Sequence, residues 1–129
     1  MIRHVKKYFV IRSYVRRLSH ELAGRFGLRS FYKVEHVTQA VQRGGFSASF
    51  IAYAHAAFCD REDFKAYYQP LGAAYSYQDL RGLIADRYLS GRRDFDARTI
   101  IHKFRRGDYS SGNFYESGIG TDGSDSGGN

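Results

Sequence analysis

The sequence predicts an all-α domain: a compact bundle of about five or six helices with a long N-terminal helix and a disordered C-terminal tail. Three observations support this prediction. Apolar residues recur at helical spacing through most of residues 1–106, and the connectors between these segments are short and rich in Gly, Ser and Asp. No segment shows the apolar–polar alternation between turns that predicts strands. The 129 residues therefore fit one domain, residues 1–106, followed by the tail, residues 107–129.

The first predicted helix covers residues 1–22 and carries apolar side chains on two nearly opposite faces. The longer face repeats at helical spacing and consists of Ile11, Tyr14, Val15, Leu18 and Leu22. The shorter face holds Ile2, Val5 and Phe9. Because a straight helix can turn only one face to the core, we expect the longer face to be buried and the shorter one to be exposed. The alternative is a bend near Tyr8–Val10 that lets both faces pack inward.

Glycines mark the ends of the first two helices. Gly24 and Gly27 are expected to end the N-terminal helix, and a short second helix is predicted over Val34–Arg43. Gly44 and Gly45 follow it directly. Glycine favours a helix C-terminus because it adopts left-handed backbone conformations without steric cost.

The most apolar stretch, Phe46–Cys59, is expected to be the central helix of the fold. Its residues are apolar or small on nearly every side, which is typical of a buried helix. Ser47 is its predicted N-cap. Asp60 is a second predicted N-cap with acidic residues after it, so we expect a break before Asp60 and a separate short helix over Arg61–Tyr68.

The last two predicted helices begin at capping residues. Ser76 and Asp79 have the spacing of a capping box, with Asp in place of the usual Glu, and their helix is expected to run to Leu89. Asp94 is the predicted cap of the final helix, which is expected to run from Phe95 to about Arg106.

The positive charge is concentrated near the N-terminus. The net charge is +7, and residues 1–33 hold nine Lys or Arg and a single acid. The tail holds seven of the fourteen glycines and no base, so it cannot bury enough apolar surface to offset the entropy of ordering it, and we expect it to be disordered. The tail can also fold over the basic helix and screen it through its acids, Asp108, Glu116, Asp122 and Asp125.

Several classes of protein are excluded by the composition. A single cysteine cannot form an intramolecular disulfide, and no apolar run approaches the ~18 residues of a transmembrane helix. The apolar residues Phe9–Ile11 are interrupted at once by Arg12, which argues against a signal peptide. We therefore expect a cytoplasmic location, with the inner face of the membrane as a place where the basic helix can dock.

Four segments are the basis of a resemblance to a known family: VEHVTQAVQRGG, FIAYAHAAFCDREDF, SYQDLRGLIADRYLSG and DFDARTI. With the basic N-terminal helix and the Gly-rich tail, they make the chain resemble a family of short bacterial proteins catalogued only as a domain of unknown function. The resemblance covers about residues 1–120. It implies a small helical bacterial protein, and it assigns no functional residue because the family has no established activity.

His55 and Cys59 lie four residues apart on the predicted central helix, a spacing that suits two metal ligands or a thiol beside a base. A closed zinc site needs four ligands, and the other histidines have no matching spacing. We therefore expect a packed histidine and a buried cysteine, with a metal or thiol site as the alternative. No nucleophile motif or phosphate-binding loop is present, so the sequence predicts no enzyme, no catalytic residue, no metal and no cofactor.

The candidate binding surface is the basic N-terminal helix. Its candidate residues are Arg3, Lys6, Lys7, Arg12, Arg16, Arg17, Ile2, Val5 and Phe9. An exposed apolar strip edged by bases is typical of a helix that docks on an anionic membrane surface or on a protein partner. The first alternative is binding of RNA or DNA, with the bases on phosphates and with Tyr8, Phe9 and Tyr14 stacking on nucleobases. The second is a solvated charged face that binds nothing.

Overall fold

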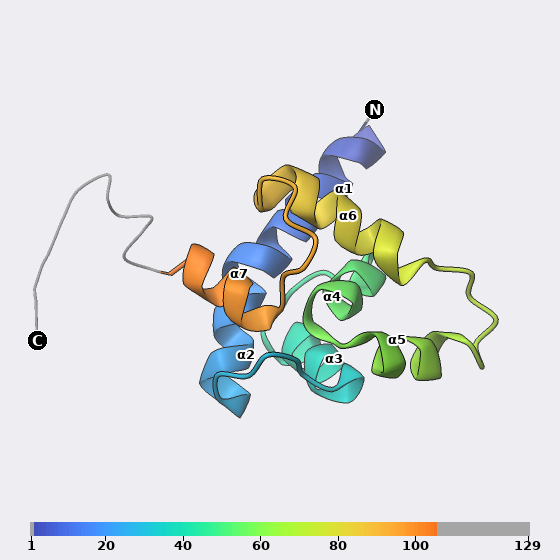
Figure 1. Cartoon of the computed structure of the whole chain (residues 1–129), viewed down its shortest axis with the longest axis horizontal. Coiled ribbons are helices and arrows are strands. Elements are labelled where there is room, and N and C mark those ends of the chain that lie inside the picture. The colour runs from blue at the N-terminus through green and yellow to red at the C-terminus, as the bar shows by residue number, and fades with distance from the viewer. Residues whose placement is uncertain (1, 106–129) are drawn as a thin grey trace, which may run out of the picture.

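The computed structural model describes residues 2–105, with side chains from residue 6 onward, and the regular elements in that range are all helical (Figure 1). The N-terminal helix is continuous and consists of α1 (Ile2–Ser13), a π-helical turn η1 (Tyr14–Leu18) and α2 (Ser19–Phe26). Five further helices follow: α3 (Val34–Arg43), α4 (Ile51–Phe58), α5 (Arg61–Tyr68), α6 (Tyr77–Tyr88) and α7 (Ala97–Lys103). The all-α prediction is confirmed. The prediction of a disordered tail concerns residues outside the described range.

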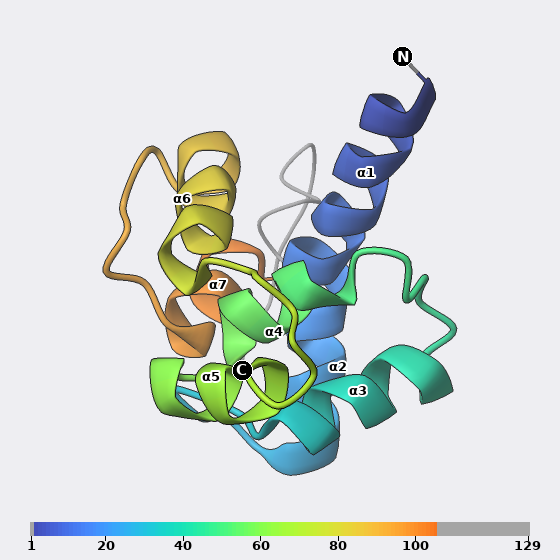
Figure 2. The same ribbon diagram turned by 90° about the vertical axis from the view of Figure 1, so that its right-hand side faces the viewer.

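The N-terminal helix buries the face that its sequence pattern predicts. Ile11, Tyr14, Val15, Leu18 and Leu22 are all buried, whereas 63% of the Phe9 surface is exposed. The helix continues to Phe26, past the predicted end at residue 22, because Gly24 keeps a helical conformation and only Gly27, at φ +86°, ends it. Figure 2 shows the first turns of α1 extending beyond the neighbouring helices.

A π-helical turn interrupts the α-helical pattern of this helix at Tyr14–Leu18, whereas Tyr8–Val10 lie within the regular turns of α1. The Ser19 N–H donates to the Tyr14 carbonyl, five residues back, where an α-helix would bond four residues back. Serine hydroxyls on either side bond locally to the backbone: Ser13 Oγ donates to the Val10 carbonyl at 2.7 Å, and Ser19 Oγ donates to the Val15 carbonyl at 2.8 Å. Such bonds compete with the regular helical ladder and help to accommodate a wider turn.

Helix α4 lies at the centre of the fold, packed against α3, α5, α6 and η1 (Figure 2). The predicted start of this helix is wrong: α4 begins at Ile51, and Ser47 is not its N-cap. The Ser47 carbonyl instead accepts the hydroxyl of buried Tyr14, and Ser47 Oγ accepts the Ser49 N–H at 3.2 Å. Residues 46–50 therefore form a connector, which the bond between Tyr14 and Ser47 joins to η1.

The predicted break in the apolar stretch is confirmed, as are two predicted caps. Asp60 Oδ1 accepts the Asp63 N–H at 2.8 Å at the start of α5. Ser76 Oγ accepts the Asp79 N–H at 3.2 Å at the start of α6, which is one of the two bonds of the predicted capping box. Each of these bonds satisfies a backbone donor that the first turn of a helix leaves without a partner.

The final helix begins later than predicted. Its N-cap is Asp96, which forms a reciprocal capping box with Thr99, whereas Asp94 pairs with Arg92 at the surface. The Phe95 side chain is buried in the core and holds the chain extended at the point where the prediction placed the first helical residue. Within residues 2–105, we find no helical segment with the length and apolar character needed to cross a bilayer.

Candidate functional site

The outer face of the N-terminal helix carries a shallow groove with a volume of about 430 Å³. We call it the basic groove, and it is lined by Phe9, Arg12, Ser13, Arg16 and Arg17. These side chains come from neighbouring turns of α1 and η1 and alternate with the buried face, so the packing of the buried face fixes their direction. The apolar member, Phe9, lies beside strongly basic ones.

Aromatic rings from distant segments support two arginines of the groove. The guanidinium carbon of Arg16 lies 5.7 Å from the ring centre of Phe104, the residue that follows α7. That of Arg17 lies 5.4 Å from the ring centre of Phe46, in the connector before α4. Cation–π contacts of this kind contribute about 0.5–1 kcal/mol at exposed sites. They also restrict the arginine side chains, so the groove is partly ordered before any ligand arrives.

The structure separates the residues that the sequence grouped as one binding surface. Lys7 is directed away from the groove, with Nζ 5.4 Å from the ring centre of Tyr53 on α4. Lys6 is exposed. The side chains of residues 2–5 are outside the described part of the chain, so the predicted roles of Ile2, Arg3 and Val5 stay predictions.

Three bases near the start of the N-terminal helix, Lys6, Arg12 and Arg17, form no ion pair with an acid in the part of the chain whose side chains are described. Within residues 6–105 the ion pairs join Arg25 to Glu21, Arg92 to Asp94 and Arg93 to Asp86. None of these pairs involves Lys6, Arg12 or Arg17 in that range. Closely spaced charges of one sign repel each other and raise the local positive potential.

His55 is a fully buried histidine with both ring nitrogens hydrogen-bonded. Its Nδ1 lies 2.6 Å from the Tyr68 hydroxyl on α5, and its Nε2 lies 2.9 Å from the Thr38 hydroxyl on α3. Burial lowers the pKa of His55 to about 4 because the charged form loses its hydration. Neutral His55, which belongs to α4, thus links that helix to α3 and α5 through its two side-chain hydrogen bonds.

Cys59, the predicted companion of His55, is also fully buried. Burial, with Asp63 and Asp60 nearby, raises the pKa of its thiol well above the usual range. A thiol in this state is a poor nucleophile and a poor metal ligand, because both roles use the thiolate. Among the described residues, no cluster of three or more His, Cys, Asp or Glu is arranged to hold a metal ion.

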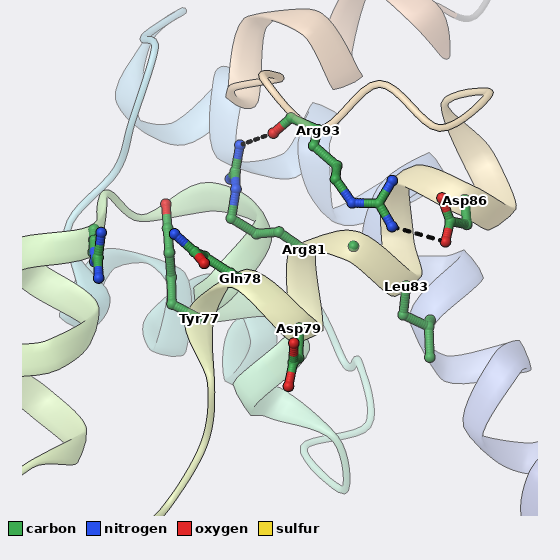
Figure 3. A pocket seen from close by; sticks show the side chains of 9 residues that line it. Tyr77, Gln78, Asp79, Arg81, Leu83, Asp86 and Arg93 are labelled. Carbon is green, nitrogen blue, oxygen red and sulfur yellow. Dashed lines mark hydrogen bonds and ion pairs between the residues drawn. The ribbon is translucent and has the colours of Figure 1, made fainter.

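A larger cleft, about 730 Å³, lies along α6 and was not predicted (Figure 3). At its back, buried Arg81 donates to the carbonyls of Ala56 at 3.0 Å, Arg93 at 3.4 Å and, more closely, Phe95. Arg93 reaches across α6 and pairs with Asp86 at 3.0 Å. Two of the arginines that line this cleft are thus used for internal bonds, and Arg81 acts as a brace between α4, α6 and the connector before α7.

Two features were not predicted from the sequence: the aromatic support of the basic groove by Phe46 and Phe104, and buried Arg81 in the cleft along α6. Phe46 and Phe104 are far from the basic helix in the chain, and helical periodicity carries no information about such long-range contacts. The burial of Arg81 could have been predicted from its position, because Arg81 directly follows Leu80 in a helix whose neighbouring positions are buried. A basic residue beside buried positions indicates a charge that needs partners inside the fold.

Comparison with known protein families matches residues 2–129 to the family described as "Family of unknown function (DUF6559)". The chain belongs to this family. The DUF6559 match confirms the resemblance predicted from the sequence motifs. Searches of curated proteins and of solved structures found no match. A function for this DUF6559 chain must therefore be argued from its own residues.

Proposed function

We propose that this DUF6559 chain is a non-enzymatic docking module that binds an anionic phospholipid surface through the basic groove. The observation that supports the proposal most is the exposed ring of Phe9, 63% accessible, beside Arg12 and Arg17, which have no ion pair within residues 6–105. A helix face of this kind can place its ring at the headgroup boundary while its arginines meet lipid phosphates. The first turns of α1, which precede the basic groove along the helix, extend beyond the neighbouring helices (Figure 2).

The expected affinity is modest. Burying the Phe9 ring contributes about 2 kcal/mol, and each basic side chain near an anionic leaflet contributes about 1 kcal/mol. With the three arginines of the groove the sum is about 5 kcal/mol, which corresponds to sub-millimolar, reversible binding. Reversible binding of this strength suits a module that attaches and detaches as surface charge changes.

The burial of Tyr14 and the partial burial of Tyr8 favour a membrane over nucleic acid as the ligand. Of the three rings predicted to stack on nucleobases, Tyr14 is buried with its hydroxyl on the Ser47 carbonyl. Tyr8 is half-buried, with the Arg87 guanidinium carbon 3.8 Å from its ring centre. Only Phe9 of that predicted set is exposed, and one ring gives little of the successive stacking on which binding to single strands depends.

Reversing two charges in the groove is expected to abolish docking. The double variant Arg12→Glu, Arg17→Glu replaces attraction by repulsion at two positions, so affinity for phosphatidylserine-rich vesicles should fall by about a hundredfold or more. Co-sedimentation of the full chain with vesicles at low salt measures this. The matched control is Arg61→Glu, Lys65→Glu, which makes the same charge change on two exposed residues of α5.

Two results would contradict the proposal. One is failure of the unmodified chain to sediment with these vesicles at low salt. The other is an equal loss of binding in the α5 control, which would show that total charge, rather than the groove, determines binding. Preferential binding to single-stranded RNA over vesicles would favour the nucleic-acid alternative.

A further inference from the structure

The described part of the chain ends beside the basic groove. Phe104 lies against Arg16 of the groove, 5.7 Å from ring centre to guanidinium carbon. The Phe104 carbonyl is hydrogen-bonded to His20 Nε2, one turn further along the N-terminal helix. A single described residue, Arg105, follows. The C-terminal segment, residues 107–129, is thus tethered next to the surface that we assign to lipid.

The C-terminal segment is long enough to reach every part of the basic groove. A Gly-rich chain of this length has a root-mean-square end-to-end distance of about 27 Å. The groove extends from Phe9 to Arg17, about 12 Å along the helix axis. A tether of this kind gives an effective local concentration in the millimolar range, so even weak complementarity produces substantial occupancy.

The C-terminal segment also matches the groove in chemistry. It contains four acids and no base, whereas the groove contains three arginines. Its apolar side chains adjoin an acid in the run Phe114-Tyr115-Glu116, as Phe9 adjoins arginines in the groove. A segment with both features can place rings against Phe9 and carboxylates against the guanidinium groups.

We propose that the acidic C-terminal segment binds the basic groove of its own chain and competes there with anionic lipid. The contact itself is independent of any ligand; its regulatory consequence rests on the proposed function. When the segment occupies the groove, the apparent lipid affinity falls in proportion to the fraction of molecules whose groove is open. Docking is thus favoured only where the surface charge is high enough to displace the segment.

The contact can be measured without lipid. The chain has no Trp, so Phe9→Trp places one fluorescent reporter in the groove. In this background the segment is neutralised in the full chain by Asp108→Asn, Glu116→Gln, Asp122→Asn and Asp125→Asn. Quenching of the reporter by acrylamide, a neutral quencher, should rise about twofold, because at roughly half occupancy half of the rings are shielded.

The control changes the same number of charges elsewhere. It carries Glu35→Gln, Glu62→Gln, Asp86→Asn and Asp94→Asn, all at exposed positions. Its quenching should equal that of the Phe9→Trp parent. Equal quenching in the parent, the segment variant and the control would overturn the proposed contact.

The consequence for docking is measured with the same charge variants on phosphatidylserine-rich vesicles. The affinity of the segment variant should exceed that of the control by about twofold, because at roughly half occupancy only half of the grooves are open when the segment is unmodified. If the chains bind vesicles and the segment variant gains no more than the control, the regulatory inference is wrong while the docking function stands. If quenching shows the contact and no chain binds vesicles, the docking function fails and the intramolecular contact stands.

Discussion

Replacing Arg81 by Met is expected to lower the free energy of unfolding by about 3 kcal/mol. The guanidinium group donates to three carbonyls, those of Ala56, Arg93 and Phe95, and lies 3.8 Å from the Phe95 ring centre. Ala56 is in the last turn of α4, where carbonyls have no helical partner, so Arg81 also caps that helix. Methionine fills much of the volume and removes the cost of burying a charge, but it leaves these buried carbonyls without donors. Urea denaturation measures the loss.

The variant Arg81→Lys separates the contribution of the positive charge to stability from that of the planar guanidinium group. Lysine retains the positive charge at the end of α4 but lacks the planar fork that reaches several carbonyls at once. We therefore expect a stability between those of the unmodified chain and Arg81→Met. A loss below about 1 kcal/mol in Arg81→Met would show that the brace does not stabilise the fold as described.

The chain should lose stability as the pH falls below about 6.5, because His55 is held neutral in the fold. An unfolded histidine has a pKa near 6.5, whereas the pKa of folded His55 is about 4. Between these values the unfolded state binds more protons, so the free energy of unfolding decreases as pH decreases. The stabilisation is fully present above pH 6.5, and about 3 kcal/mol of it is lost by about pH 4.

The variant His55→Gln isolates this contribution, because glutamine can bond to Thr38 or Tyr68 and does not titrate. Urea denaturation at pH 7.5 and at pH 5 should show a smaller loss in the variant than in the unmodified chain, by about 2 kcal/mol. Identical pH slopes in the two chains would show that His55 is not the group responsible. Tyr68 stays protonated over this range, since burial raises the pKa of its hydroxyl above the usual value.

Local signals in the sequence predicted the helices well, because caps and glycines act within one turn. Asp60 and Ser76 begin α5 and α6 as expected, and Gly44 follows α3 as expected. The errors arose where a distant contact outweighed a local preference. Ser47 is bound to Tyr14 across the fold instead of capping α4, and burial of Phe95 moves the last cap to Asp96.

The candidate site was predictable only in part. The apolar spacing predicted that Phe9 is exposed, and the concentration of bases near the N-terminus identified Arg12, Arg16 and Arg17 as binding candidates. Three features lay beyond that reasoning: the π-helical turn, the ring contacts from Phe46 and Phe104, and the hydrogen bond between His20 and the Phe104 carbonyl. All three depend on tertiary packing, which a one-dimensional pattern does not encode.

The most direct test of the docking claim is the tryptophan emission of Phe9→Trp during titration with phosphatidylserine-rich vesicles. The proposal predicts a blue shift that saturates, that disappears at high salt and that is absent with uncharged phosphatidylcholine vesicles. A tryptophan at Leu71, equally exposed at 63% on the turn after α5, serves as the control and should not shift. No shift at position 9, or equal shifts at positions 9 and 71, would contradict docking through the basic groove.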